Sequence, residues 1–156
     1  MKLFHLNENI HYTNNMLLNT YEMVRHTEPK LYGVTEIYIL KMHLCIERLL
    51  GEMILKSPSI SNKMIKNTFS SKRELVENLF DPNIYGELFK KVYVLNKIRN
   101  EIAHNLESTS YQRLLNMLDQ RIEVEKGYEL TPDSMHTLKK QLGDLYSLLL
   151  VIKESM

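Results

Sequence analysis

Apolar residues recur at intervals of three and four along almost the whole chain, and this spacing constrains the fold most. It places them on one side of an α-helix, whereas a half-buried strand needs strict alternation. Glycine is scarce, at 5 of 156 residues, and no Asn-Gly or Asp-Gly hairpin signal occurs. The sequence therefore predicts an all-α fold. The clearest stripe, with intervals of 3, 4, 3, 4 and 3, consists of Met135, Leu138, Leu142, Leu145, Leu149 and Ile152.

Two long helices are expected in the first part of the chain. The second covers residues 34–56 and is broken by Ser57-Pro58-Ser59. Its apolar residues reach round most of its circumference, which is typical of a central helix packed by several neighbours or by a second subunit. The first helix ends at Glu28-Pro29-Lys30 and Gly33, and its stripe is Leu6, Ile10, Thr13, Leu17, Tyr21 and Val24.

Capping residues mark four further helix starts. The helix opened by Asp81 is expected to run to about Leu106, and the last one to cover most of Pro132 to Glu154, after Gly127 has ended the segment before it. Together these elements predict a compact up-and-down bundle of four longer helices with one or two short ones, in one domain over residues 1–156. The starts are Ser71 with Glu74, Asp81 with Pro82, Thr109 with Gln112, and Thr131 with Pro132.

Composition and charge exclude several classes of protein. Cys45 is the single cysteine, so no disulfide framework exists, and a reducing cytoplasm is the natural setting. The N-terminus turns polar too soon for a signal peptide, and no apolar run approaches the roughly 20 residues that span a bilayer. A net charge of +1 argues against a general nucleic-acid coating protein. Basic residues do gather locally, which solvated helix faces would explain, at Lys63, Lys66, Lys72 and Arg73 and at Lys90, Lys91 and Lys97.

The segment from Lys97 to His104 carries the chemistry that stands out in this chain. Arg99, Asn100 and His104 lie within two turns of one expected helix. An arginine can hold and neutralise a phosphate, and a histidine can move a proton near neutral pH. Asn100 and His104 are four residues apart, so the amide can orient the imidazole. The arginine and the histidine together are the minimum equipment for cutting a phosphodiester without a metal.

Structural explanations also exist for these residues. On a helical wheel Arg99 falls on the stripe of Tyr85, Leu88, Val92, Leu95, Ile102 and Leu106. A buried guanidinium needs a partner or a cleft, so Arg99 could pair with Glu47 on the second helix or extend to solvent. His104 could be an exposed histidine that interacts with the helix dipole.

The segment resembles the Arg-x4-6-His signature of the HEPN superfamily, in which a polar residue usually follows the arginine. Asn100 fills that position, Ala103 precedes the histidine, and the motif lies near the end of a long penultimate helix in an all-α chain. The resemblance implies a metal-independent endoribonuclease, the toxin or effector of a prokaryotic defence or toxin–antitoxin system. It also implies RNA as substrate, a homodimer and an antitoxin protein as a further partner. Catalysis would fall to Arg99, Asn100 and His104.

One geometric problem bears on this interpretation. At about 100° per residue, Arg99 and His104 lie about 140° apart on a continuous helix. Either the helix ends or distorts near Ala103, or motif helices from two subunits meet about a two-fold axis. The resemblance favours the second solution, because nucleases of the superfamily typically place two copies of the motif at a dimer interface.

A non-catalytic function on the same scaffold is the alternative. Some members of the superfamily act as regulators or adaptors, including proteins resembling the mannitol-operon repressor. In toxins paired with a nucleotidyltransferase antitoxin, a tyrosine commonly stands two residues after the histidine, where this chain has Leu106. Regulation by that route is therefore not assigned.

No cofactor and no metal site are expected from the motifs. A glycine-rich phosphate loop is missing from the sequence, and the histidines show no HxxxH spacing. His43 and Glu47 are four residues apart, for which a local helix pair is the simpler explanation than a ligand set. The remaining histidines are His5, His11, His26 and His136.

Overall fold

A computed structural model describes residues 33–60, 66–104, 108–125 and 129–156. Within these ranges the chain forms five helices and no strand, apart from one isolated bridge between Val124 and Leu130. The predicted all-α fold is confirmed. The expected first helix lies outside the described residues. The helices are α2 (Val34–Lys56), α3 (Phe69–Glu77), α4 (Pro82–His104), α5 (Ser108–Leu118) and α6 (Pro132–Ser155).

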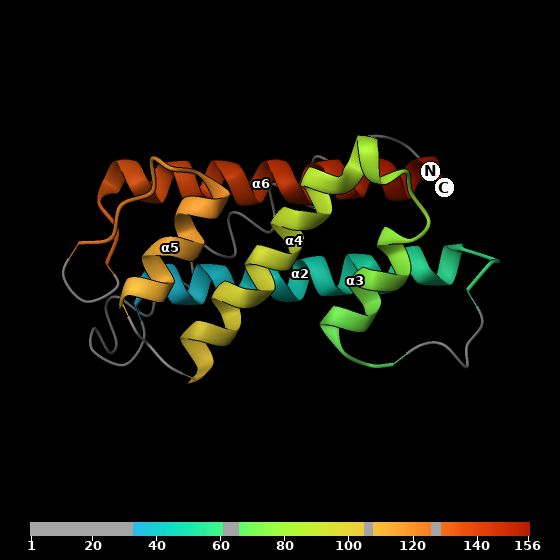
Figure 1. Cartoon of the computed structure of the whole chain (residues 1–156), viewed down its shortest axis with the longest axis horizontal. Coiled ribbons are helices and arrows are strands. Elements are labelled where there is room, and N and C mark those ends of the chain that lie inside the picture. The colour runs from blue at the N-terminus through green and yellow to red at the C-terminus, as the bar shows by residue number, and fades with distance from the viewer. Residues whose placement is uncertain (1–32, 61–65, 105–107, 126–128) are drawn as a thin grey trace.

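The helices form two layers (Figure 1). In one layer α2 and α6 lie side by side, and in the other α4 crosses obliquely, between α3 at one end and α5 at the other. Helix α4 runs in the opposite sense to α2 and α6, as an up-and-down bundle requires. No helix in the described part of the chain is both long enough and apolar enough to cross a membrane.

Contacts at both ends fix α2 and α6 in parallel. Near their N-terminal ends the hydroxyl of Tyr38 donates to the carbonyl of Lys139 at 3.4 Å. Near their C-terminal ends Nζ of Lys153 donates to Oε2 of Glu52 at 2.9 Å. Burial works against the charges of Glu52 and Lys153, but hydrogen bonds outweigh it, lowering the pKa of Glu52 and raising that of Lys153. The ion pair therefore stabilises the parallel alignment.

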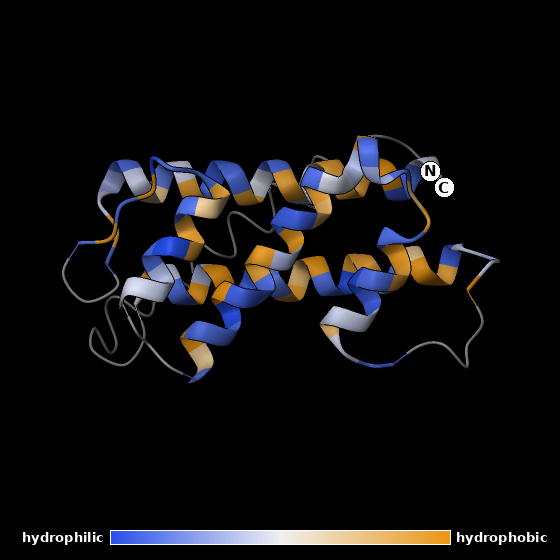
Figure 2. Ribbon diagram, in the orientation of Figure 1, coloured by the Kyte–Doolittle hydropathy of each residue, from blue (hydrophilic) through white to orange (hydrophobic). Residues whose placement is uncertain are grey.

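The core fills the space between the two layers. Helix α4 buries Phe89, Val92, Val94, Leu95 and Ile98, and Figure 2 shows apolar segments where it crosses α2 and mostly hydrophilic ones toward its C-terminal end. The apolar stripe predicted for α6 is confirmed, with Met135 half-buried and the rest buried. In α2 the prediction of an apolar circumference is only partly right, because Leu44 and Leu55 point into solvent.

Two of the four predicted caps are confirmed. Oδ1 of Asp81 accepts from the backbone N–H of Asn83 at 2.8 Å, directly before Pro82 opens α4. The hydroxyl of Thr131 accepts from the backbone N–H of Ser134 at 3.0 Å, and α6 begins at Pro132.

The other two caps were predicted wrongly. Helix α3 begins at Phe69, and its cap is Thr68, whose hydroxyl accepts from the backbone N–H of Ser71. Helix α5 begins at Ser108, so Thr109 is not its cap. Gln112 instead reaches beyond α5, where its amide donates to the carbonyl of Ile122 at 2.7 Å and accepts from the N–H of Val124 at 2.7 Å. Its side chain thus fixes the segment that follows α5.

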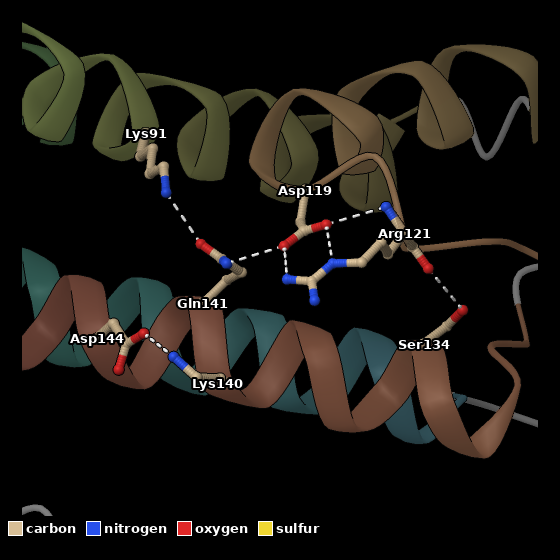
Figure 3. A network of polar contacts seen from close by, with 7 residues as sticks. All are labelled: Lys91, Asp119, Arg121, Ser134, Lys140, Gln141 and Asp144. Atoms are coloured by element: carbon tan, nitrogen blue, oxygen red, sulfur yellow. Dashed lines mark hydrogen bonds and ion pairs between the residues drawn. The ribbon is translucent and has the colours of Figure 1, made fainter.

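Asp119 is the centre of a polar network that joins α4, α6 and the segment after α5 (Figure 3). Its carboxylate accepts from the backbone N–H of Arg121 at 2.9 Å and from the guanidinium of the same residue. The amide of Gln141 on α6 donates to it at 2.9 Å and accepts from Nζ of Lys91 on α4 at 2.9 Å. Hydrogen bonds from Arg121 lower the pKa of Asp119 far below its ordinary value.

Candidate functional site

The last two turns of α4 carry the three candidate residues. Ile98 is fully buried and anchors this part of the helix in the core. Arg99 and Asn100 are half-buried, whereas His104 is exposed and is the last residue of α4. The structure describes α4 as far as His104, and the predicted boundary at Leu106 lies outside the described residues. The motif stands at the edge of the bundle, where a ligand can reach it.

Arg99 is bound by an amide. Its Nη1 donates to Oδ1 of Asn100 at 3.2 Å, and no carboxylate of the described residues lies within ion-pair distance of its guanidinium. The pair considered with Glu47 is not formed, because Glu47 accepts from Nζ of Lys72 at 2.9 Å. Among the described residues, therefore, only Asn100 occupies a donor of the Arg99 guanidinium, which has five.

Arg99 lies at the edge of the core stripe of α4. The helical wheel placed Arg99 on this stripe together with Leu95 and Ile102, but the structure buries Ile98 and leaves Ile102 half-buried. The reason is that α4 changes neighbours along its length and contacts α2, α3, α5 and α6. A single stripe drawn for one flat interface therefore misplaces the residues near its ends.

Within one copy of the chain, neither Arg99 nor Asn100 contacts the imidazole of His104 through a hydrogen bond. No hydrogen bond between described side chains joins His104 to either residue, and the carbonyl oxygen of Asn100 is occupied by Arg99. The predicted orientation of the imidazole by Asn100 is thus not seen within one copy. Helix α4 is regular through Ala103 to His104, the last residue of this helix that the structure describes, so no distortion lies at Ala103 itself.

A second histidine, which the sequence analysis did not assign, lies beside Arg99. Nε2 of His43 on α2 lies 3.0 Å from Oδ1 of Asn96 on α4, and the amide nitrogen of Asn96 donates to the hydroxyl of Ser70 on α3 at 3.3 Å. Because the Asn96 oxygen is an acceptor, Nε2 of His43 is the donor. The His43 ring also stacks on Phe69, with 4.1 Å between centroids.

The surroundings of His43 favour its neutral form, chiefly through burial. Burial lowers the pKa of His43, and the positive charge of Arg99 adds to that effect. The hydrogen bond with Asn96 and the charge of Glu47 oppose the shift without reversing it. His43 and Asn96 are 53 residues apart, so no sequence spacing could have linked them. The pair fixes α4 against α2 one turn before the motif.

The described residues contain no group of three or more His, Cys, Asp or Glu that could hold a metal ion. What the arrangement offers is a guanidinium that no described carboxylate neutralises and an imidazole at the last described position of the same helix. The chain matches no model of a protein family, and the comparisons with curated proteins and with solved structures find no match either.

Proposed function

We propose that this protein is a metal-independent endoribonuclease that acts as a homodimer, with Arg99, Asn100 and His104 of both copies at a shared site. The observation that carries the proposal is the state of Arg99, which is half-buried, bound to an amide and not neutralised by any carboxylate of the described residues. A purely structural arginine in this position should be paired, because a buried unpaired charge is costly. An arginine whose function is to bind a phosphate should have no carboxylate partner in the unbound protein, and Arg99 has none among the described residues.

The reaction needs a ribose 2′-hydroxyl, so the substrate is RNA. The 2′-oxygen attacks phosphorus and the bond to the 5′-oxygen breaks, which leaves a 2′,3′-cyclic phosphate and a free 5′-hydroxyl. One His104 takes the proton of the 2′-hydroxyl, and the second copy of His104 gives a proton to the leaving oxygen. Arg99 stabilises the negative charge that develops on the phosphate oxygens, and Asn100 holds its guanidinium in place.

The resemblance to the HEPN superfamily supports this proposal. An all-helical fold with the motif at the end of a long helix agrees with that family, and membership in it is part of what we propose. The biological setting would then be a prokaryotic defence or toxin–antitoxin system, with an antitoxin protein as a further partner.

The direct test is cleavage of single-stranded RNA in excess EDTA, followed by identification of 2′,3′-cyclic phosphate ends. His104→Ala should lower the rate by about 10²–10⁴-fold, the usual value of general acid–base catalysis, with an unchanged melting temperature because the side chain is exposed. Arg99→Ala should also abolish cleavage. Matched controls are His136→Ala and Arg113→Ala, which change an exposed histidine on α6 and an exposed arginine on α5 and should keep full activity.

Mixing the two inactive variants tests the shared site. If the two copies share the site, a mixed dimer of Arg99→Ala and His104→Ala keeps one Arg99 and one His104 there, so either the base or the acid is still present and cleavage returns in part. If each copy holds its own site, mixing restores nothing. Light scattering should show a dimer at micromolar concentration, and a monomer there would contradict the proposal.

A regulatory or adaptor protein on the same scaffold is the second candidate. It is favoured by one observation, namely that no contact between described side chains joins Arg99 to His104 within one copy. In that case no RNA is cleaved, and Arg99→Ala mainly lowers the melting temperature. The same set of variants therefore separates the two functions.

A further inference from the structure

A stripe of four side chains runs along the outer side of α4 and ends at the candidate site. Tyr93, Lys97, Asn100 and His104 follow one another at intervals of four, three and four residues, so they share one side of the helix. Tyr93 is 41% exposed, Lys97 and His104 are exposed, and Asn100 is half-buried. An aromatic ring, a cation and an amide thus lead along the helix to the imidazole.

Two cations lie against the ring of Tyr93, and only one of them is paired with described carboxylates. Cζ of Arg73 lies 5.4 Å from the ring centroid, and its guanidinium is ion-paired with Glu74 and Glu77. Nζ of Lys97 lies 5.2 Å from the same centroid, and no described carboxylate pairs with it. Arg73 is thus a fixed neighbour of the ring, whereas Lys97 can move away.

Most of the neighbouring lysines are already occupied. Lys90 pairs with Glu87 on its own helix, Lys91 donates to Gln141, and Lys72 pairs with Glu47. Of the cluster that the sequence showed around this helix, Lys97 therefore remains available for a phosphate. It is also the one that lies beside an exposed aromatic ring.

We propose that Tyr93 is a stacking platform for one base of a single-stranded RNA, with Lys97 as the contact to the adjoining phosphate. The proposal rests on the ribonuclease function and names a binding subsite for its substrate. Unpaired bases stack on aromatic side chains in single-strand recognition, and neighbouring cations hold the backbone. On binding, Lys97 leaves the ring for the phosphate and the base takes its place.

The spacing suits a strand that continues to the candidate site. At about 1.5 Å of rise per residue, Tyr93 lies about 10 Å from Asn100 and about 16 Å from His104 along the helix axis. That is a distance of a few nucleotides. A base held at Tyr93 would therefore fix the strand shortly before the phosphate that Arg99 binds, and would set which bond is cut.

The absence of tryptophan from this chain makes the platform easy to test. In a His104→Ala background, which leaves RNA intact, Tyr93→Trp introduces the sole indole. Titration with a short single-stranded oligoadenylate should quench its fluorescence, whereas the same RNA in a duplex should not. The matched control is Ile84→Trp, on the same helix and 71% exposed but outside the stripe, and it should stay unquenched. Equal quenching of both indoles, or none at position 93, overturns the proposal.

Binding of a labelled oligoadenylate, followed by anisotropy, gives a second readout that does not depend on the indole. Tyr93→Phe should bind as the unsubstituted protein does, whereas Tyr93→Ala should bind about five- to a hundredfold more weakly, the range of one lost stacking contact. Lys97→Ala should weaken binding and its salt dependence, and Lys90→Ala should do neither. If position 93 is quenched but the unsubstituted protein cleaves no RNA, the stacking platform is supported and the ribonuclease function is overturned. If the protein cleaves RNA but position 93 is not quenched, the ribonuclease function is supported and the stacking platform is overturned.

Discussion

Nε2 of His43 lies 3.0 Å from Oδ1 of Asn96, and this contact joins α2 to α4 about one helical turn before Arg99. The imidazole is buried, stacked on Phe69 and neutral. It therefore positions α4 without taking part in the proposed reaction. Its protonation, however, should matter for the stability of the fold.

We expect the free energy of unfolding to fall between about pH 7.5 and pH 5, in part because of His43. Its pKa in the folded state lies below the value of about 6.5 expected in the unfolded chain. In that window the unfolded state binds more protons, so stability rises with pH and is lost as the pH falls. Urea unfolding at both pH values should show a smaller loss for His43→Gln, whose amide can still donate to Asn96. The control His136→Gln, on the surface of α6, should keep the original slope.

The acid limb of the stability curve should depend on Asp119. Hydrogen bonds from Arg121 lower the pKa of this carboxyl, so the stability it contributes is present above its unfolded pKa of about 3.9 and disappears as the pH falls through the folded value. Asp119→Asn should cost about 1 kcal/mol at neutral pH, the typical net value of a hydrogen bond, and flatten the curve below pH 4 or so. Asp144→Asn, which removes only an exposed pair with Lys140, should leave that limb unchanged.

Loss of the cap of α6 should destabilise the protein measurably. The hydroxyl of Thr131 accepts from the backbone N–H of Ser134, and no other described residue is a partner of that donor. Thr131→Ala should lower the free energy of unfolding by about 1 kcal/mol, whereas Thr131→Ser keeps the hydroxyl and should lose much less. Chemical denaturation of both variants checks this, and equal losses would show that the methyl group matters more than the cap.

Two leucines of α6 differ in burial and therefore form a matched pair for a stability test. Leu142 is fully buried, whereas Leu148 is 55% exposed. Leu142→Ala should cost about 2–5 kcal/mol, because it removes buried surface and leaves a cavity. Leu148→Ala should stay within about 0.5 kcal/mol of the unsubstituted protein, as surface changes usually do. A large loss at position 148 in denaturation experiments would mean that this side of α6 is covered in solution.

The elements that the sequence predicted best are those with local start and stop signals. Helix α2 was expected over residues 34–56 and has those bounds, because Ser57-Pro58 ends it. Helix α6 begins at Pro132 for the same kind of reason. The start of α3 was misjudged, because Thr68 and Ser71 are both good caps. The choice between them goes with the burial of Phe69 against His43, a contact between different helices that no local pattern reveals.

The sequence could predict that the three candidate residues share one helix, but it could not predict which residues contact them. Spacing alone places Arg99, Asn100 and His104 on the end of one helix. It could not show that Lys72, 25 residues from Glu47, would occupy that carboxylate and leave Arg99 with an amide. Nor could it reveal Asn96 as the link to His43. Such competition among polar groups is decided by tertiary packing, which the sequence pattern does not contain.

The parallel alignment of α2 and α6 has a consequence for how the chain folds. The contacts that align them join residues 97 and 101 positions apart, whereas α3, α4 and α5 contact their neighbours in the chain. Closing a long loop costs more entropy than closing a short one, and distant contacts slow folding. The segment from α3 to α5 should thus gain structure early, and α6 should dock late. Until it does, the side of α2 that carries Tyr38 and Glu52 lacks its contacts with α6.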